Sequence, residues 1–243
     1  MTGRPSRLVF ADPGEAVELA AFLGRLLRWE KNAAVRLRGT GDGVLGVFGR
    51  PARFEVLAVR TARLSEPVEL DATVSAGELL EGVEEEAGAV SVPGAVTGPP
   101  WAGMLPPRGG WQPVGDLPYE SVRAAAASVV AEFRRRSEAL PPAERTREAM
   151  DALAEEIWSR PLGGGTGLPL RAVHAAQALG MLRPVAPAVA AGPHGLVGRG
   201  GPAGAGGPRV AVLAAGAWLR LRTPYGSTAV RRGGGTGLSV SPL

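Results

Sequence analysis

Arginine is the residue type with the clearest chemical pattern in the second half of this sequence. The last acidic residue is Glu156, and the 87 residues that follow it contain nine arginines. Guanidinium groups bind phosphate oxygens in bidentate fashion, and a long stretch without carboxylates attracts polyanions. Four of these arginines lie close together in the sequence: Arg220, Arg222, Arg231 and Arg232. They are candidates for binding the phosphates of nucleic acid, or alternatively an acidic protein partner.

A second group of polar residues lies on a predicted helix that begins near Pro169 and ends at about Gly180. Arg171, His174 and Gln177 are three residues apart, so they share one helix face, opposite a stripe of Ala and Leu. Arg and Gln side chains suit the reading of base edges, which makes this face a candidate nucleic-acid surface. The alternative is that the face is only the solvated side of an amphipathic helix.

Few residues of the chain are of the types that enzymes and metal sites use. It has no Cys, a single Lys (Lys31) and two His (His174 and His194). Disulfides, thiolate ligands and Cys nucleophiles are therefore excluded, and no Asp or Glu follows residue 156 to complete a metal site beside either His. We expect no catalytic residues, no metal and no cofactor. An enzyme that uses carboxylates of the first half is the alternative.

Two Gly-rich motifs resemble nucleotide-binding loops. The residues 41–46 spell GxGxxG, but a strand follows them where a dinucleotide site needs a helix, so they predict a hairpin turn. The hexapeptide GGGTGL occurs at 163–168 and again at 233–238, without the Lys-Ser/Thr of a P-loop. Its backbone amides could bind an anion, although a flexible linker is the favoured interpretation.

Residues 1–86 predict an α/β module. Asp12-Pro13-Gly14-Glu15 is typical of a helix start, and the helix runs to about Trp29. Strands are predicted around 35–38 and over 44–48, 54–62 and 68–74, and the last of these alternates so that the sheet has one wet face. A second capping box at 75–78 opens a short helix. The module is a candidate for self-association or partner binding.

The rest of the chain divides into a linker, a helical module and a tail. Residues 87–118 are rich in Pro and Gly and contain Trp101 and Trp111, which we expect to pin this linker to the surface; a docking segment is the alternative. Residues 119–232 form the basic module, with helices over 119–140, 144–159 and 169–180. Its residues 183–208 are expected to be a flexible insertion, and 233–243 a flexible tail.

A β-hairpin is predicted at the end of the basic module. With a four-residue turn at Pro224–Ser227, Leu221 faces Val230 and Arg220 faces Arg231. Arg220, Arg222 and Arg231 then share one face. Three helices followed by a basic hairpin is the element order of a winged helix, so the predicted fold class is α+β with a winged-helix-like second module.

Two segments carry a resemblance to known sequences: LPPRGGW at 105–111 and WLRLRTPYGSTAVRR at 218–232. Through them the chain resembles uncharacterised domain-of-unknown-function proteins of high-GC actinobacteria, a resemblance that implies no activity. No apolar run approaches the length of a membrane span, and no signal-peptide core is present, so we expect a cytoplasmic protein that binds no membrane.

Overall fold

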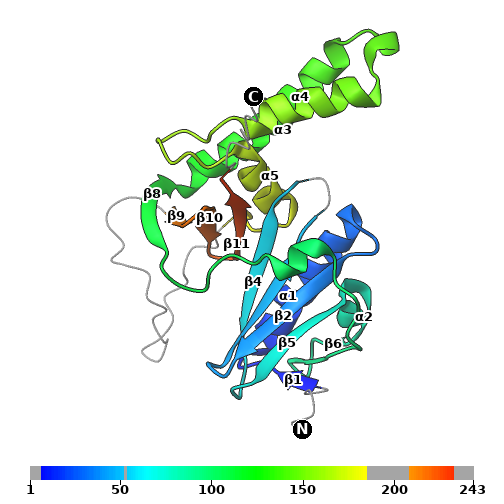
Figure 1. The fold of residues 1–243 in the computed structure, drawn as a ribbon, viewed down its shortest axis with the longest axis vertical. Helices are drawn as coiled ribbons and strands as arrows, with labels where there is room; N and C mark the ends of the chain where they lie inside the picture. Colours follow the sequence, from blue (N-terminus) through cyan, green and yellow to red (C-terminus); the bar gives the residue numbers. More distant parts are fainter. Residues whose placement is uncertain (1–6, 52–53, 185–207, 233–243) are drawn as a thin grey trace, which may run out of the picture.

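The computed structural model describes residues 7–51, 54–184 and 208–232, and its largest feature is an antiparallel sheet of eight strands (Figure 1). The strand order is β5-β2-β3-β4-β11-β10-β9-β8. A smaller sheet holds β1 (Arg7–Val9), β7 (Ala89–Ser91) and β6 (Val83–Glu84). The fold is α+β, as predicted. Most of the predicted insertion at 183–208, and the whole predicted tail at 233–243, lie outside the described residues.

The first half of the chain has the predicted elements. Helix α1 (Pro13–Trp29) is capped by Asp12, whose carboxylate accepts a hydrogen bond from the Gly14 amide at 2.7 Å. Its apolar stripe is buried at Leu19, Phe22, Leu23 and Leu26. Four strands and a short helix follow: β2 (Ala34–Thr40), β3 (Val44–Gly49), β4 (Leu57–Arg63), β5 (Glu69–Ser75) and α2 (Ala76–Glu81). The predicted turn at 41–46 is the β2–β3 hairpin, where Gly41 and Gly43 have positive φ.

The second half contains the three predicted helices and two strands that the sequence pattern did not indicate. The helices are α3 (Tyr119–Ala139), α4 (Arg147–Ser159) and α5 (Leu170–Ala178). The two strands absent from the sequence prediction are β8 (Gln112–Pro118) and β9 (Arg209–Ala215). The predicted hairpin is formed by β10 (Trp218–Thr223) and β11 (Gly226–Arg231). Residues 87–118, predicted as a linker, thus contain β7, the 3-10 helix η1 (Pro100–Gly103) and β8. The two prolines of β8 are tolerated because it is an edge strand.

The predicted register of the β10–β11 hairpin was wrong by two residues. Thr223 pairs with Gly226, so the turn consists of Pro224 and Tyr225 alone. Leu221 lies opposite Thr228, and Arg220 lies opposite Ala229 rather than Arg231. Because side chains alternate with a period of two, this shift leaves every side chain on its predicted face.

The two halves meet in the middle of the large sheet, where β4 pairs with β11. One core runs through both halves and includes Leu23 and Val47 from the first and Val173 and Leu221 from the second. Helices α1 and α5 cover the same face of the sheet: Thr228 of β11 donates a hydrogen bond to the Ala172 carbonyl of α5. Helices α3 and α4 extend away from the sheet as a hairpin (Figure 1) and hold a second, small core around Ile157.

The predicted winged-helix order is not confirmed. A wing is a peripheral hairpin, whereas β10 and β11 are interior strands of the eight-stranded sheet. Helix α5 packs on that sheet through Ala172, Val173, Ala175 and Ala176, all of them fully buried.

The other face of the sheet is crossed by residues 92–111, here called the strap. Ala95 pairs with Val74 at the β5 edge, and the chain continues across to β8 at the opposite edge (Figure 1). The sequence predicted Thr73 on the wet face, but the strap covers it and only 7% of the residue is exposed. The strap is joined to β5 at this point by a hydrogen bond from the Val96 amide to the Thr73 carbonyl at 2.9 Å. On the rest of this face, Thr61, Arg222 and Arg231 are exposed, whereas Val59 and Ala229 are buried. We call it the open face.

Candidate polyanion interface

Arg220, Arg222 and Arg231 lie on the open face of the sheet, and Arg232 follows at the end of β11. We call these four residues the hairpin arginines. Cross-strand pairing places Arg220 beside Ser227 and Ala229, and the Arg220 guanidinium donates to the Ser227 hydroxyl at 2.9 and 2.7 Å. Burial, and then the neighbouring Arg222 charge, lower the pKa of Arg220 below its usual value. The other three side chains are exposed.

No carboxylate neutralises the hairpin arginines. None of them has a carboxylate oxygen within 4.0 Å in the parts of the chain that the structure describes, whereas Arg209 on the neighbouring strand pairs with Asp116. All 23 Asp and Glu residues of the sequence fall in those described parts. The side chains outside them therefore cannot supply the missing negative charge.

Two tryptophans stand beside the hairpin arginines. The Arg220 guanidinium lies 5.5 Å from the centre of the Trp111 ring, and that of Arg231 lies 6.0 Å from the centre of the Trp218 ring. Trp111 belongs to the strap and donates from its indole nitrogen to the Pro107 carbonyl at 2.9 Å. That hydrogen bond stays within the strap, and the ring contact with Arg220 is what joins Trp111 to the sheet.

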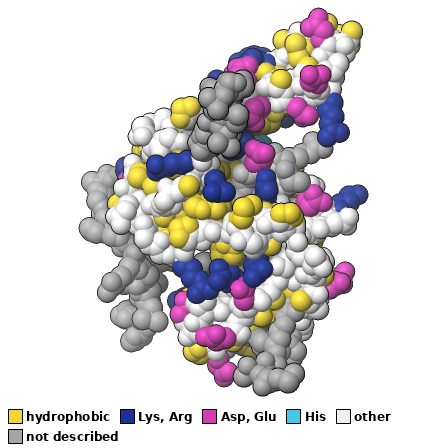
Figure 2. Space-filling view, in the orientation of Figure 1, with side chains coloured by type: hydrophobic (Ala, Val, Ile, Leu, Met, Phe, Trp, Pro, Cys, Tyr) yellow, Lys and Arg dark blue, Asp and Glu magenta, His cyan; other side chains and the backbone are white. Residues whose placement is uncertain are grey.

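A second basic cluster lies on the same face, nearer the β5 edge. Arg36 donates from Nε to Asp71 at 2.7 Å, and this hydrogen bond, helped by the charges of Arg38 and Arg108, holds the pKa of Asp71 below its usual range. Arg36 and Arg38 thus pair with one carboxylate, on which the charge of Arg108 also acts. Figure 2 shows Lys and Arg side chains in two bands on this side of the molecule, with hydrophobic side chains between them.

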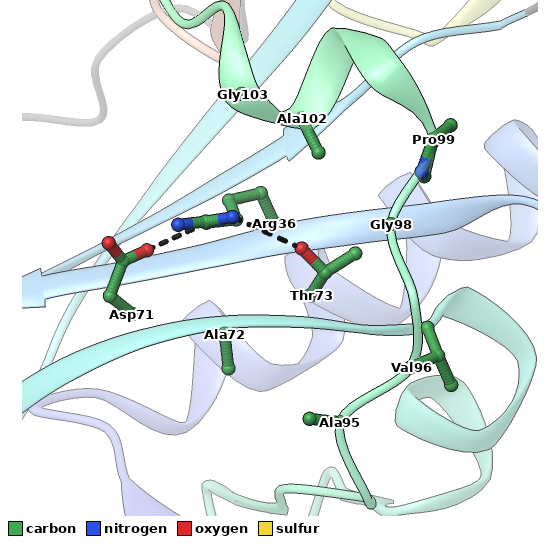
Figure 3. A pocket seen from close by; sticks show the side chains of 10 residues that line it. All are labelled: Arg36, Asp71, Ala72, Thr73, Ala95, Val96, Gly98, Pro99, Ala102 and Gly103. Carbon is green, nitrogen blue, oxygen red and sulfur yellow. Dashed lines mark hydrogen bonds and ion pairs between the residues drawn. The ribbon is translucent and has the colours of Figure 1, made fainter.

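A pocket of about 410 Å³ lies beside Arg36 and Asp71, under the strap (Figure 3). Arg36 reaches both Asp71 and the Thr73 hydroxyl, and the strap residues Val96, Pro99 and Ala102 close the other side (Figure 3). Asp71 is the one carboxylate of this lining, and its ion pair keeps it charged. The pocket therefore lacks the pair of carboxylates that general acid–base catalysis would need.

The predicted base-reading residues lie on the opposite side of the sheet from the hairpin arginines. Arg171 is held by two carboxylates, Glu55 at 2.8 Å and Glu155 at 2.5 Å, and its side chain is 15% exposed. His174 lies between the rings of Phe54 and Trp158, with centroids 5.0 and 5.1 Å away, and burial lowers its pKa to about 4.

Gln177 is the exposed member of the predicted α5 group. The structure therefore brings together Arg220, Arg222, Arg231 and Arg232, and it separates them from Arg171, His174 and Gln177. Sequence reasoning missed Arg108 and the two ring contacts of Trp111 and Trp218. The motif at 105–111 contains both Arg108 and Trp111, but nothing in its sequence places it across the sheet from β5 to β8.

Comparison with known sequences matches each half of the chain to a protein family. Residues 106–235 match the family described as Domain of unknown function (DUF8185), which is more than half of the chain. The chain belongs to the DUF8185 family. Residues 4–103 match a second family, described as Domain of unknown function (DUF8010). These matches confirm the resemblance to domains of unknown function.

The boundary between the two matches falls inside the strap, so the DUF8185 part carries β8, the three helices α3 to α5 and the hairpin arginines. No curated protein matches the chain, and neither does any solved structure. Among the described residues, no helix is both long and apolar enough to cross a bilayer.

Proposed function

We propose that this protein binds nucleic acid along the open face of its sheet, through the phosphate contacts of Arg220, Arg222, Arg231 and Arg232. The observation that carries the proposal is that these four guanidinium groups gather on one hairpin with no carboxylate partner in the described structure. Arginines that serve only to stabilise a fold are commonly paired, as Arg171, Arg183 and Arg209 are here. Unpaired guanidinium groups on one surface supply the electrostatic part of polyanion binding.

Single strands are the preferred ligand in this proposal. Trp111 and Trp218 lie next to Arg220 and Arg231, and aromatic rings beside guanidinium groups are the usual means of holding unstacked bases. The paired Arg171 and the buried His174 argue against a major-groove reading helix. The proposal places the protein in the cytoplasm and needs neither metal nor cofactor.

The test is a titration of fluorescent single-stranded and duplex DNA and RNA with the full chain at about 50 mM salt, where phosphate contacts are strong. The Arg220→Gln/Arg222→Gln variant removes two unpaired charges. Its matched control, Arg123→Gln/Arg147→Gln, removes two charges, one half-buried and one exposed, that pair with Glu120 and Asp151. We expect the first variant to bind at least tenfold more weakly than wild type and the control to bind within a factor of about two.

Polyglutamate serves as the competitor that separates nucleic acid from an acidic protein partner. Under the proposal, polyglutamate of equal charge displaces the oligonucleotide only weakly because it offers no bases to the tryptophans. Equal competition by polyglutamate would overturn the proposal in favour of an acidic protein partner. Absence of oligonucleotide binding at about 50 mM salt would overturn it outright.

A further inference from the structure

A pocket of about 540 Å³ lies where the loop between α4 and α5 meets the end of the β10–β11 hairpin. Its polar lining comes from Ser159, from the loop residues 165–167 and from the last two hairpin arginines, Arg231 and Arg232. Leu219 and Val230 provide an apolar floor. The volume lies within the range of about 300–1,000 Å³ that small-molecule sites occupy.

The loop holds the first GGGTGL hexapeptide, and its backbone conformation requires glycine. Gly164, Gly165 and Gly167 have φ of 86°, 69° and 68°, which side-chain-bearing residues rarely adopt. The loop is closed at its base, where the Leu162 amide donates to the Leu168 carbonyl at 2.6 Å. In the described structure the amides of residues 163–167 donate to no protein acceptor. Gly165, Thr166 and Gly167 line the pocket, so their amides are candidate donors to a ligand.

The formal charges that line this pocket are all positive. Arg231 and Arg232 line it, no carboxylate does, and neither arginine has an ion pair within the described residues. Pro169 also lines the pocket and is the N-cap residue of α5, so the positive end of that helix dipole lies close by, as does the negative end of α4 at Ser159. The two arginines therefore set the sign of the charge. Unpaired amides together with two guanidinium groups are the donor set that binds a phosphate group.

We propose that this pocket binds the terminal phosphate of a nucleic acid strand. The loop amides and the guanidinium groups of Arg231 and Arg232 donate to its oxygens. Leu219 and Val230 face the α5 side of the sheet, so the strand passes around the end of the hairpin at Arg231 before it continues on the open face past Arg220 and Arg222. The inference therefore rests on the proposed function. A terminal phosphate carries up to two negative charges, whereas an internal phosphate carries one. It therefore accepts more hydrogen bonds from the amides and guanidinium groups and is attracted more strongly to the two arginines.

The test compares oligonucleotides that differ only in a 5′-phosphate, a 3′-phosphate or a free hydroxyl at both ends. We expect one of the phosphorylated strands to bind the wild-type chain about tenfold more tightly than the hydroxyl strand. Arg232→Gln and Gly165→Ala should each abolish this difference. Inorganic phosphate should shift the NMR amide signals of residues 163–167 in the wild-type chain.

Matched controls exist for both variants. Arg222→Gln removes a charge from the same face outside the pocket, so it should weaken both strands equally and retain the difference between them. Gly216→Ala introduces a side chain at a second open turn with positive φ (52°), so it reports the cost of backbone strain alone.

The outcomes separate this inference from the proposed function. Equal binding of phosphorylated and hydroxyl strands would overturn the inference and leave the proposed function standing. Amide shifts with inorganic phosphate, but no binding of any strand, would overturn the proposed function and assign the pocket to a free phosphate compound instead. Absence of both effects would overturn both proposals.

Discussion

The Thr228 hydroxyl donates a hydrogen bond to the Ala172 carbonyl at 3.0 Å, and this contact fixes which face of β11 the helices cover. Ser227, the preceding residue, points the other way and accepts from Arg220. Two adjacent side chains therefore separate the α5 side of the sheet from the open face. The arrangement makes the two sides independently testable by mutation.

Thr228→Val should lower the free energy of unfolding by about 1 kcal/mol, since it removes one buried hydrogen bond while keeping the side-chain shape. Oligonucleotide binding should be unchanged because residue 228 faces away from the arginines. Urea denaturation measures the first effect. The control is Thr61→Val on the exposed side of β4, which should change stability by only a few tenths of a kcal/mol. Equal effects of the two variants would contradict the account of the α5 contact.

Arg60 joins the two family-matched halves of the chain. Its guanidinium lies 3.3 Å from a Glu15 carboxylate oxygen and donates to the Tyr225 carbonyl at 2.9 Å, and its side chain is 10% exposed. Arg60→Met should cost about 3 kcal/mol because it leaves Glu15 and Glu18 without their buried partner.

The control for Arg60 is Arg63→Met. Arg63 also pairs with Glu15, at 3.8 Å, but its side chain is 68% exposed, so its loss should cost less than about 1 kcal/mol. Thermal and urea unfolding measure both variants. Losses of similar size would show that burial of Arg60 does not set the strength of this contact.

His174 should make the protein less stable as the pH falls below neutral. Burial lowers its pKa from 6.5 to about 4, so the unfolded chain takes up a proton at a higher pH than the folded chain does. Stability is therefore lost as the pH falls from about 6.5 to about 4, and the expected loss between pH 7.5 and pH 5 is about 2 kcal/mol.

His174→Phe keeps an aromatic ring between Phe54 and Trp158 and removes the titrating group. The variant should lose most of this pH dependence in urea denaturation at the two pH values. A wild-type protein with the same free energy of unfolding at pH 7.5 and pH 5 would refute the assignment.

Local sequence patterns predicted the elements whose signals are themselves local. The capping residue Asp12 and the apolar stripe of α1 are where the sequence places them, because caps and helix periodicity depend on neighbours within four residues. The hairpin register was wrong because a shift of two residues preserves every side-chain face, so alternation cannot detect it. Strand β8 was missed because Pro113 and Pro118 argue against a strand unless it lies at an edge.

The candidate site was predictable in part, for a related reason. Alternation placed Arg220, Arg222 and Arg231 on one face, and the absence of acidic residues after Glu156 indicated a surface that attracts polyanions. That absence could not show which arginines are unpaired, because Arg171, Arg183 and Arg209 of the same stretch have carboxylate partners. Helical spacing likewise placed Arg171 and His174 on one face of α5, but it cannot predict which other residues cover that face. Glu55, which pairs with Arg171, is 116 residues away in the sequence. Such a contact depends on the tertiary fold.

Binding at the open face is tested by the salt dependence of single-stranded oligonucleotide binding by wild type, Arg220→Gln/Arg222→Gln and Gln177→Ala. Each phosphate contact contributes about 0.7 to the slope of log K against log[salt]. If the open face binds the strand, the double arginine variant lowers the magnitude of this slope by about 1.4, and Gln177→Ala leaves both slope and affinity unchanged. A wild-type slope in the arginine variant, or a large loss of affinity in Gln177→Ala, would contradict binding at the open face.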